Sequence, residues 1–148
     1  MVVNEYASKI EAPAERIWDL FATEAGQLLL SRGFVKGMDF EGEGLGLVRT
    51  MHTEGHWGNT YVVERCDHFD PVNREVTYAI IDTGGIVPFA DYRGSAKVIP
   101  AGPAACVLML RSTFIPVDMS EDDAKALSEA NFRLLFDNVK SAVVSGEI

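Results

Sequence analysis

The chain has 148 residues, the usual size of one domain, and can bury enough apolar surface to fold without a metal or a disulfide. Its formal net charge of −9 disfavours nucleic acid and anionic membranes as partners, since both carry negative charge. The N-terminal residues show no secretory leader, and no apolar run is long enough to span a bilayer. We therefore expect a cytoplasmic protein with a single domain over residues 1–148.

The chain has two cysteines, Cys66 and Cys106, and each lies within an apolar run with the character of a strand. Two reduced, buried thiols are the expected state, and a disulfide between neighbouring strands is the alternative. A pair of catalytic thiols is disfavoured because the chain has no C-x-x-C motif.

The first part of the chain predicts one strand followed by two short helices. The strand is expected over residues 2–10. Pro13 suits the first turn of a helix, and apolar residues at helical spacing continue this helix to about residue 22. A second short helix is expected from about Glu24 to Leu30, and Gly33 ends it.

From Phe34 onward the apolar pattern alternates, which is typical of strands. Six further strands are expected, at residues 34–41, 46–53, 59–69, 74–82, 89–99 and 104–116. Short segments rich in Gly, Pro, Asn and Asp separate them. Connections this short require antiparallel neighbours, because parallel strands need long crossovers.

The last segment predicts one long helix of roughly 25 residues. Ser120 is the expected N-cap, with Asp123 three residues further on. One apolar face of this helix is formed by Leu127, Ala130, Leu134 and Ala142. Asn131 and Asn138 lie within the same face, where amides are unusual, and they are the first sign of a ligand.

A second apolar stripe lies nearly opposite and consists of Phe132, Phe136 and Val143. Apolar stripes outside a core often mark interfaces, so a homodimer through this stripe is one interpretation. Packing of the stripe on the two short helices is the other interpretation.

One strand, two short helices, six strands and one long helix predict an α+β protein of the helix-grip type. In this fold a seven-stranded, curved antiparallel sheet wraps around the long C-terminal helix. Such a grip leaves space between helix and sheet, which suits a small and largely apolar ligand.

Six segments in order resemble a known superfamily. They are I-E-A-P-A-E-R-I-W-D-L-F at 10–21, V-R-T-M at 48–51, E-R-C-D-H-F-D at 64–70, G-G-I-V-P-F-A-D-Y at 84–92, R-S-T-F-I-P-V at 111–117 and D-N-V-K-S at 137–141. With these segments the chain resembles the START/Bet v 1-like superfamily, also called SRPBCC or polyketide cyclase/dehydrase. It is similar to the branch that contains the plant abscisic-acid receptors.

The resemblance implies a polar cluster within the pocket. It places the receptors' ligand-anchoring lysine at Arg32 and their water-organising glutamate at Glu64. Their tyrosine corresponds to Tyr92, and the asparagine of their helix corresponds to Asn138. A serine of the receptors' network is replaced here by Gly94, which leaves more room.

The two loops that close the receptor pocket are different in this chain. T-E-G-H-W-G at 53–58 replaces the receptors' gate, and Val87-Pro88-Phe89 replaces their latch. The resemblance therefore does not imply hormone-triggered phosphatase binding. His56 and Trp57 are expected to cover the cavity mouth, and no metal site is expected, since His52 and His56 have no evident third ligand.

Strand alternation selects the remaining pocket residues. With Glu64 inward, Tyr78, Ile80 and Asp82 of the next strand face the cavity; a shift of one residue would place Arg65 inward instead. We favour Glu64. The ligand-binding residues expected in total are Arg32, Tyr78, Ile80, Phe89, Asn131, Leu134 and Asn138.

The chemistry that this pocket suggests is cofactor-free acid–base catalysis. Glu64 would move the proton, while Tyr92 or Arg32 stabilises an enolate oxygen, as in cyclisation or dehydration of a polyketide-like substrate. Asp82 is either a second acid–base residue or a solvated strand end. The alternative function is non-catalytic carriage or sensing of a lipid, isoprenoid or hormone-like ligand, with an Arg32–Glu64 ion pair that only positions it.

Overall fold

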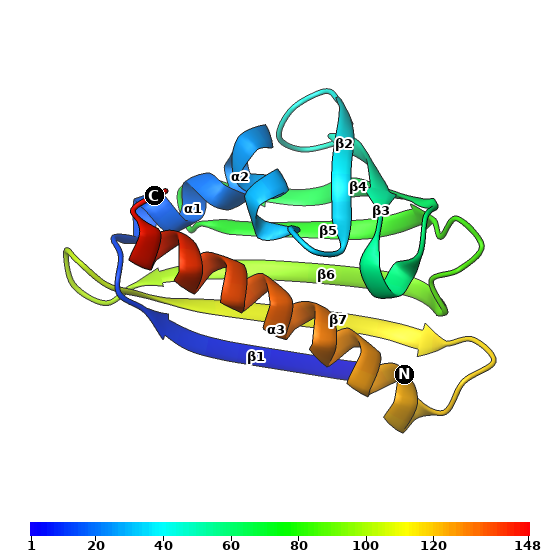
Figure 1. The fold of residues 1–148 in the computed structure, drawn as a ribbon. Helices are drawn as coiled ribbons and strands as arrows, with labels where there is room; N and C mark the ends of the chain where they lie inside the picture. Colours follow the sequence, from blue (N-terminus) through cyan, green and yellow to red (C-terminus); the bar gives the residue numbers. More distant parts are fainter.

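The computed structural model describes residues 1–148 as one sheet with helices on its concave side (Figure 1). The strands are β1 (Val2–Ile10), β2 (Val35–Glu41), β3 (Val48–Thr53), β4 (Tyr61–Asp70), β5 (Glu75–Asp82), β6 (Phe89–Pro100) and β7 (Cys106–Pro116). The helices are α1 (Ala14–Ala22), α2 (Glu24–Leu30), the 3-10 turn η1 (Gly55–Trp57) and α3 (Glu121–Ser145). The predicted order of elements is confirmed.

The sheet has the order β1-β7-β6-β5-β4-β3-β2, and every neighbouring pair is antiparallel. Strands that follow one another in the chain are therefore neighbours, except that β1 pairs with the last strand. Helix α3 runs diagonally across the concave face, and α1 and α2 lie beside its C-terminal end (Figure 1). This arrangement confirms the helix-grip fold.

Local signals set the ends of α3. The Ser120 hydroxyl accepts a hydrogen bond from the backbone N–H of Asp123 at 3.1 Å, as an N-cap does. The helix ends at Gly146, which takes the left-handed conformation with φ of 76°. Neither α3 nor any other helix is both long and apolar enough to cross a membrane.

The buried face of α3 differs from the predicted one. It is formed by Ala124, Ser128, Phe132, Phe136, Val139 and Ala142. Of the residues predicted to face inward, Ala142 is buried, Leu127 and Leu134 are half-buried, and Ala130 is exposed.

Phe132 and Phe136 explain this orientation of the helix. Both rings lie against Tyr6 of β1, with centroid distances of 6.4 and 6.2 Å, and their side chains fill the core. Burying the two phenylalanine rings removes more apolar surface from water than burying an alanine and parts of two leucine side chains, so this face of the helix is the more stable one to bury. The interpretation of Phe132 and Phe136 as an exposed dimer surface is therefore wrong.

The cysteines lie on strands that are separated in the sheet. Cys66 on β4 and Cys106 on β7 are both free and buried. Strands β5 and β6 lie between β4 and β7, so the alternative of a disulfide between neighbouring strands is wrong.

Candidate functional site

A cavity of about 170 Å³ lies between the concave face of the sheet and helices α2 and α3. Of the 26 residues that line it, 18 are hydrophobic, which suits a largely apolar ligand. The side chains with polar groups in the lining are Gln27, Ser31, Arg49, Thr53, Trp57, Glu64, Tyr78, Tyr92, Ser95 and Asn131.

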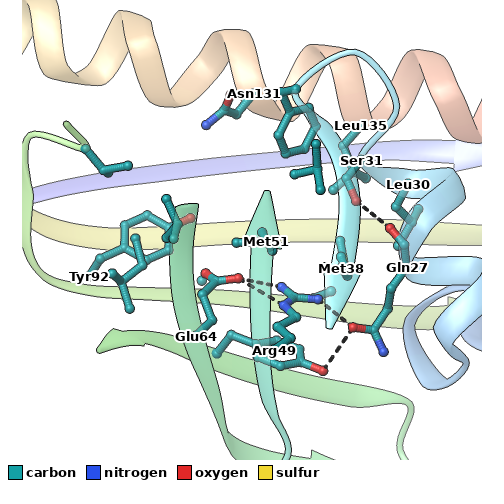
Figure 2. A pocket seen from close by; sticks show the side chains of 18 of the residues that line it. Gln27, Leu30, Ser31, Met38, Arg49, Met51, Glu64, Tyr92, Asn131 and Leu135 are labelled. Atoms are coloured by element: carbon teal, nitrogen blue, oxygen red, sulfur yellow. Dashed lines mark hydrogen bonds and ion pairs between the residues drawn. The ribbon is translucent and has the colours of Figure 1, made fainter. Parts of the chain in front are cut away.

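A buried ion pair between Arg49 and Glu64 is the main polar feature of the wall. The two residues are direct partners on β3 and β4, so both side chains point inward from neighbouring strands (Figure 2). Arg49 donates to Glu64 Oε1 from Nη2 at 2.7 Å and from Nε at 3.1 Å. Their side chains are only 16% and 8% exposed, so water screens this pair weakly.

Other neighbours fix the position of the Arg49 guanidinium. Its Nη1 donates to Gln27 Oε1 of α2 at 2.7 Å, and its carbon lies 3.7 Å from the centre of the Tyr78 ring. Burial opposes the charge of Arg49, but the Glu64 carboxylate and nearby groups more than offset this and raise the pKa of Arg49 above its ordinary value. Arg49 is a permanently charged group that holds Glu64 in place.

Both hydrogen bonds from Arg49 to Glu64 end on the same carboxylate oxygen, Oε1. Oε2 accepts no hydrogen bond from the protein, and it is not sealed from the cavity. The carboxylate therefore offers one oxygen as a free proton acceptor in a largely apolar cavity.

A β-bulge in β6 brings Phe89 to the same side of the strand as Tyr92. The pairing with β7 shifts between Ala90 and Arg93, and Asp91 within the bulge has a φ of 50°. Through this bulge Phe89 and Tyr92 both line the cavity, with their rings stacked at 5.8 Å. No protein group is hydrogen-bonded to the Tyr92 hydroxyl. Burial, and then the Glu64 carboxylate, raise the pKa of Tyr92 far above its ordinary value, so the phenol stays a neutral donor.

The space for the Tyr92 ring depends on Gly94. A Cβ atom at Gly94 would lie 2.9 Å from the Tyr92 hydroxyl oxygen and 3.1 Å from a carbon of its ring. The absent side chain thus lets the phenol lie flat over β6.

We predict that Gly94→Ala forces the Tyr92 ring to move and lowers the free energy of unfolding by about 1–3 kcal/mol, as overpacking does. Urea denaturation measures this loss. Gly37→Ala on β2 is the matched control, because a Cβ there meets no atom within 4 Å. Equal stability of the two variants would contradict the prediction.

Residues 54–60, which contain the turn η1 and are called the lid below, join β3 to β4 beside the cavity. Trp57 of η1 lines the cavity, and its ring meets Phe89 edge-on at 6.0 Å. Trp57 Nε1 and His56 Nε2 lie 3.1 and 2.8 Å from Asn131 Oδ1 on α3. The lid is therefore tied to the long helix through one amide oxygen.

A sequence model of the family described as polyketide cyclase/dehydrase and lipid transport matches residues 1–144. The chain belongs to this family. The resemblance to the SRPBCC superfamily is thereby confirmed. No curated protein is significantly similar to the chain in sequence.

Solved structures share the fold over almost the whole chain. The protein XoxI from Bacillus cereus has a TM-score of 0.84 at 19% identity, with 100% of this chain and 99% of that chain covered. The Zhui aromatase/cyclase from Streptomyces sp. R1128 has a TM-score of 0.77 at 19% identity, with 95% and 92% covered. Norcoclaurine synthase from Thalictrum flavum, in complex with dopamine and hydroxybenzaldehyde, has a TM-score of 0.72 at 17% identity, with 97% and 87% covered. At these identities the likeness concerns the fold.

The cavity between the sheet and helices α2 and α3 is lined by six of the predicted site residues. They are Glu64, Tyr78, Ile80, Phe89, Tyr92 and Asn131. The strand register has Glu64 inward, whereas Arg65 is exposed and pairs with Asp67 at 2.6 Å. The other four predicted residues lie outside the cavity lining.

Arg32 is not the cation of the cavity. Its guanidinium is exposed and donates two hydrogen bonds to the Glu147 carboxylate, at 3.1 and 2.7 Å. Arg32 lies in the turn after α2, where the C-terminal end of the chain supplies this acidic partner. The cation lies instead on β3, at Arg49, which the sequence interpretation missed.

Asp82 is exposed and does not line the cavity. The pairing of β4 with β5 shifts between Val63 and Glu64, so that Ile81 has no partner and the alternation changes at this point. The Asp82 carboxylate then accepts a hydrogen bond from the backbone N–H of Gly84 at 2.9 Å, which stabilises the following turn.

Leu134 and Asn138 connect α3 to the segment between α2 and β2. Leu134 packs against Gly33. A Cβ atom built on Gly33 would lie only 3.2 Å from Cδ2 of Leu134. Asn138 Nδ2 donates to the backbone oxygens of Leu30 and Arg32, both at 2.9 Å. Both residues therefore hold α3 against the segment between α2 and β2 and do not line the cavity.

Proposed function

We propose that the chain binds a small, largely apolar carbonyl compound and transfers a proton beside its carbonyl group without a cofactor. The observation that carries this proposal is the pair of unpartnered groups in one cavity. Glu64 Oε2 is a free acceptor, and the Tyr92 hydroxyl is a free, neutral donor. In enolisation, one such group can take the proton and the other can stabilise the enolate oxygen.

In the proposed reaction, Glu64 Oε2 takes a proton from the carbon next to the carbonyl. The electron pair of that C–H bond moves into the carbonyl, and the resulting enolate oxygen receives a hydrogen bond from Tyr92. Where the substrate carries a hydroxyl on the β-carbon, the enolate re-forms the carbonyl, a double bond forms between the α- and β-carbons, and the C–O bond breaks. Glu64 returns its proton to the leaving oxygen, which departs as water. The low polarity of the wall strengthens each of these interactions.

Arg49 supports this reaction by positioning Glu64. Its two hydrogen bonds hold Oε1 and leave Oε2 free to act on a bound ligand (Figure 2). The family description, which includes cyclases and dehydrases, agrees with this type of reaction. Cyclisation and dehydration of polyketide-like carbonyl compounds both begin with such a proton transfer.

Non-catalytic carriage is the second candidate function. The same family description includes lipid transport, and 18 of the 26 lining residues are hydrophobic. A carrier needs the cavity but not the two unpartnered groups, so the two functions differ in a measurable way.

Deuterium exchange of an apolar ketone tests the proposal. With 2-tetralone in D₂O, followed by proton NMR, we expect the protein to accelerate loss of the α-proton signals above the buffer rate. Binding of the ketone without such acceleration would contradict catalysis and support carriage. Absence of both binding and exchange would count against an apolar carbonyl ligand.

A further inference from the structure

The amide of Asn131 has a fixed orientation. Its Oδ1 atom lies 3.1 Å from Trp57 Nε1, and an indole N–H can only donate a hydrogen bond. The group facing Trp57 is therefore the oxygen, and His56 Nε2 at 2.8 Å binds the same atom. The amide nitrogen must lie on the other side, and Figure 2 shows it on the side of the side chain that faces the sheet.

The two asparagines of α3 differ in what their nitrogens do. Asn138 Nδ2 donates to two backbone oxygens, at Leu30 and Arg32, and is fully used by the protein. Asn131 lines the cavity, and no protein group accepts a hydrogen bond from its Nδ2. Asn131 is half-buried and no buried polar atom of the protein lacks a partner, so this N–H is accessible and can donate to a ligand oxygen or to water.

We propose that Asn131 determines specificity by donating a hydrogen bond to an acceptor oxygen at the lid end of the ligand. This inference rests on the proposed function and adds to it a second polar point. The ligand class is then an apolar ketone that carries a further acceptor oxygen, such as an ether or a second carbonyl, away from the reacting carbon.

The lid takes part in this recognition. Because Trp57 and His56 orient the amide, the N–H is presented to the cavity when the lid is docked on α3. A ligand with an acceptor at this point binds the docked state more tightly and shifts the lid toward it. Hydrogen exchange of the backbone amides around η1 should therefore slow more with such a ligand than with a plain ketone.

Three related ketones test the proposal: 2-tetralone, 6-methoxy-2-tetralone and 7-methoxy-2-tetralone. The dissociation constants are measured by NMR titration for the unmodified protein and for Asn131→Asp. The unmodified protein should bind at least one methoxy compound about three- to tenfold more tightly than 2-tetralone, the worth of one hydrogen bond. Asn131→Asp keeps an acceptor for the lid but replaces the N–H with an oxygen, so it should abolish this preference and still bind 2-tetralone.

Asn59→Asp is the control for added charge, because Asn59 is exposed, binds Lys36 and does not line the cavity. It should leave the preference unchanged. No preference in the unmodified protein, or a preference that survives Asn131→Asp, would overturn the role of Asn131 while 2-tetralone binding and exchange still support the proposed function. If none of the three ketones binds, the proposed function fails and this inference fails with it.

Discussion

Arg49→Met should lower the free energy of unfolding by about 3–5 kcal/mol, because it leaves a buried carboxylate without its partner. Glu64 is 8% exposed in its side chain, and both hydrogen bonds to its Oε1 come from Arg49. The variant also removes the contact with Gln27 and the stacking on Tyr78. Urea denaturation, followed by tryptophan fluorescence, measures the loss.

The double variant Arg49→Met with Glu64→Leu separates the ion pair from simple packing. Arg49→Met alone leaves the Glu64 carboxylate buried without a partner, whereas the double variant removes both charges. The double variant should therefore regain most of the free energy of unfolding that Arg49→Met loses. The exposed pair Arg111–Glu5 on the outer face is the control, and Arg111→Met should cost much less, since water screens this pair. Strictly additive losses in the double variant would contradict a coupled pair.

The fold was predictable because its signals are local in the sequence. Alternating apolar residues and short turns predict each strand, and Ser120 with Gly146 sets the ends of α3. Antiparallel pairing of consecutive strands then follows from connection length alone. Only the pairing of β1 with β7 requires a contact between the two ends of the chain.

The site was only partly predictable because its geometry depends on pairing between strands. Arg49 becomes the partner of Glu64 through the register of β3 with β4, which no local pattern of β3 reveals. The bulges matter equally: one in β6 brings Phe89 and Tyr92 to the same side, and one in β5 turns Asp82 to solvent. Alternation predicts a face correctly only as far as the next bulge.

A pairing argument could have found Arg49. Once Glu64 is assigned inward and β3 is its antiparallel neighbour, a cation is expected on the facing strand, and Arg49 is the only Arg or Lys in β3. The rotation of α3 is harder to predict, since two apolar faces compete. Packing of Phe132 and Phe136 on Tyr6 decides between them.

Glu64→Gln should slow the deuterium exchange of 2-tetralone by a factor of about 10²–10⁴, the usual contribution of a general base. The amide has the same shape, and its oxygen still accepts from Arg49, so ketone binding should persist. Glu75→Gln is the control, because Glu75 lies outside the cavity and pairs with Lys97. Exchange that continues unchanged in Glu64→Gln would remove Glu64 from the reaction.

Tyr92→Phe tests whether acid and base act together. Loss of the phenol alone should slow the exchange markedly, because the enolate oxygen loses its donor in a largely apolar cavity. If Glu64 and Tyr92 serve one transition state, the double variant should be scarcely slower than Glu64→Gln alone, since groups that act as a unit are not additive. Multiplied losses in the double variant would mean that the two residues act on separate steps.

The raised pKa of Tyr92 also predicts how the exchange rate depends on pH. The hydroxyl of Tyr92 stays protonated through the pH range in which tyrosine ordinarily ionises. The unmodified protein should therefore show no loss of rate near pH 10 from this group.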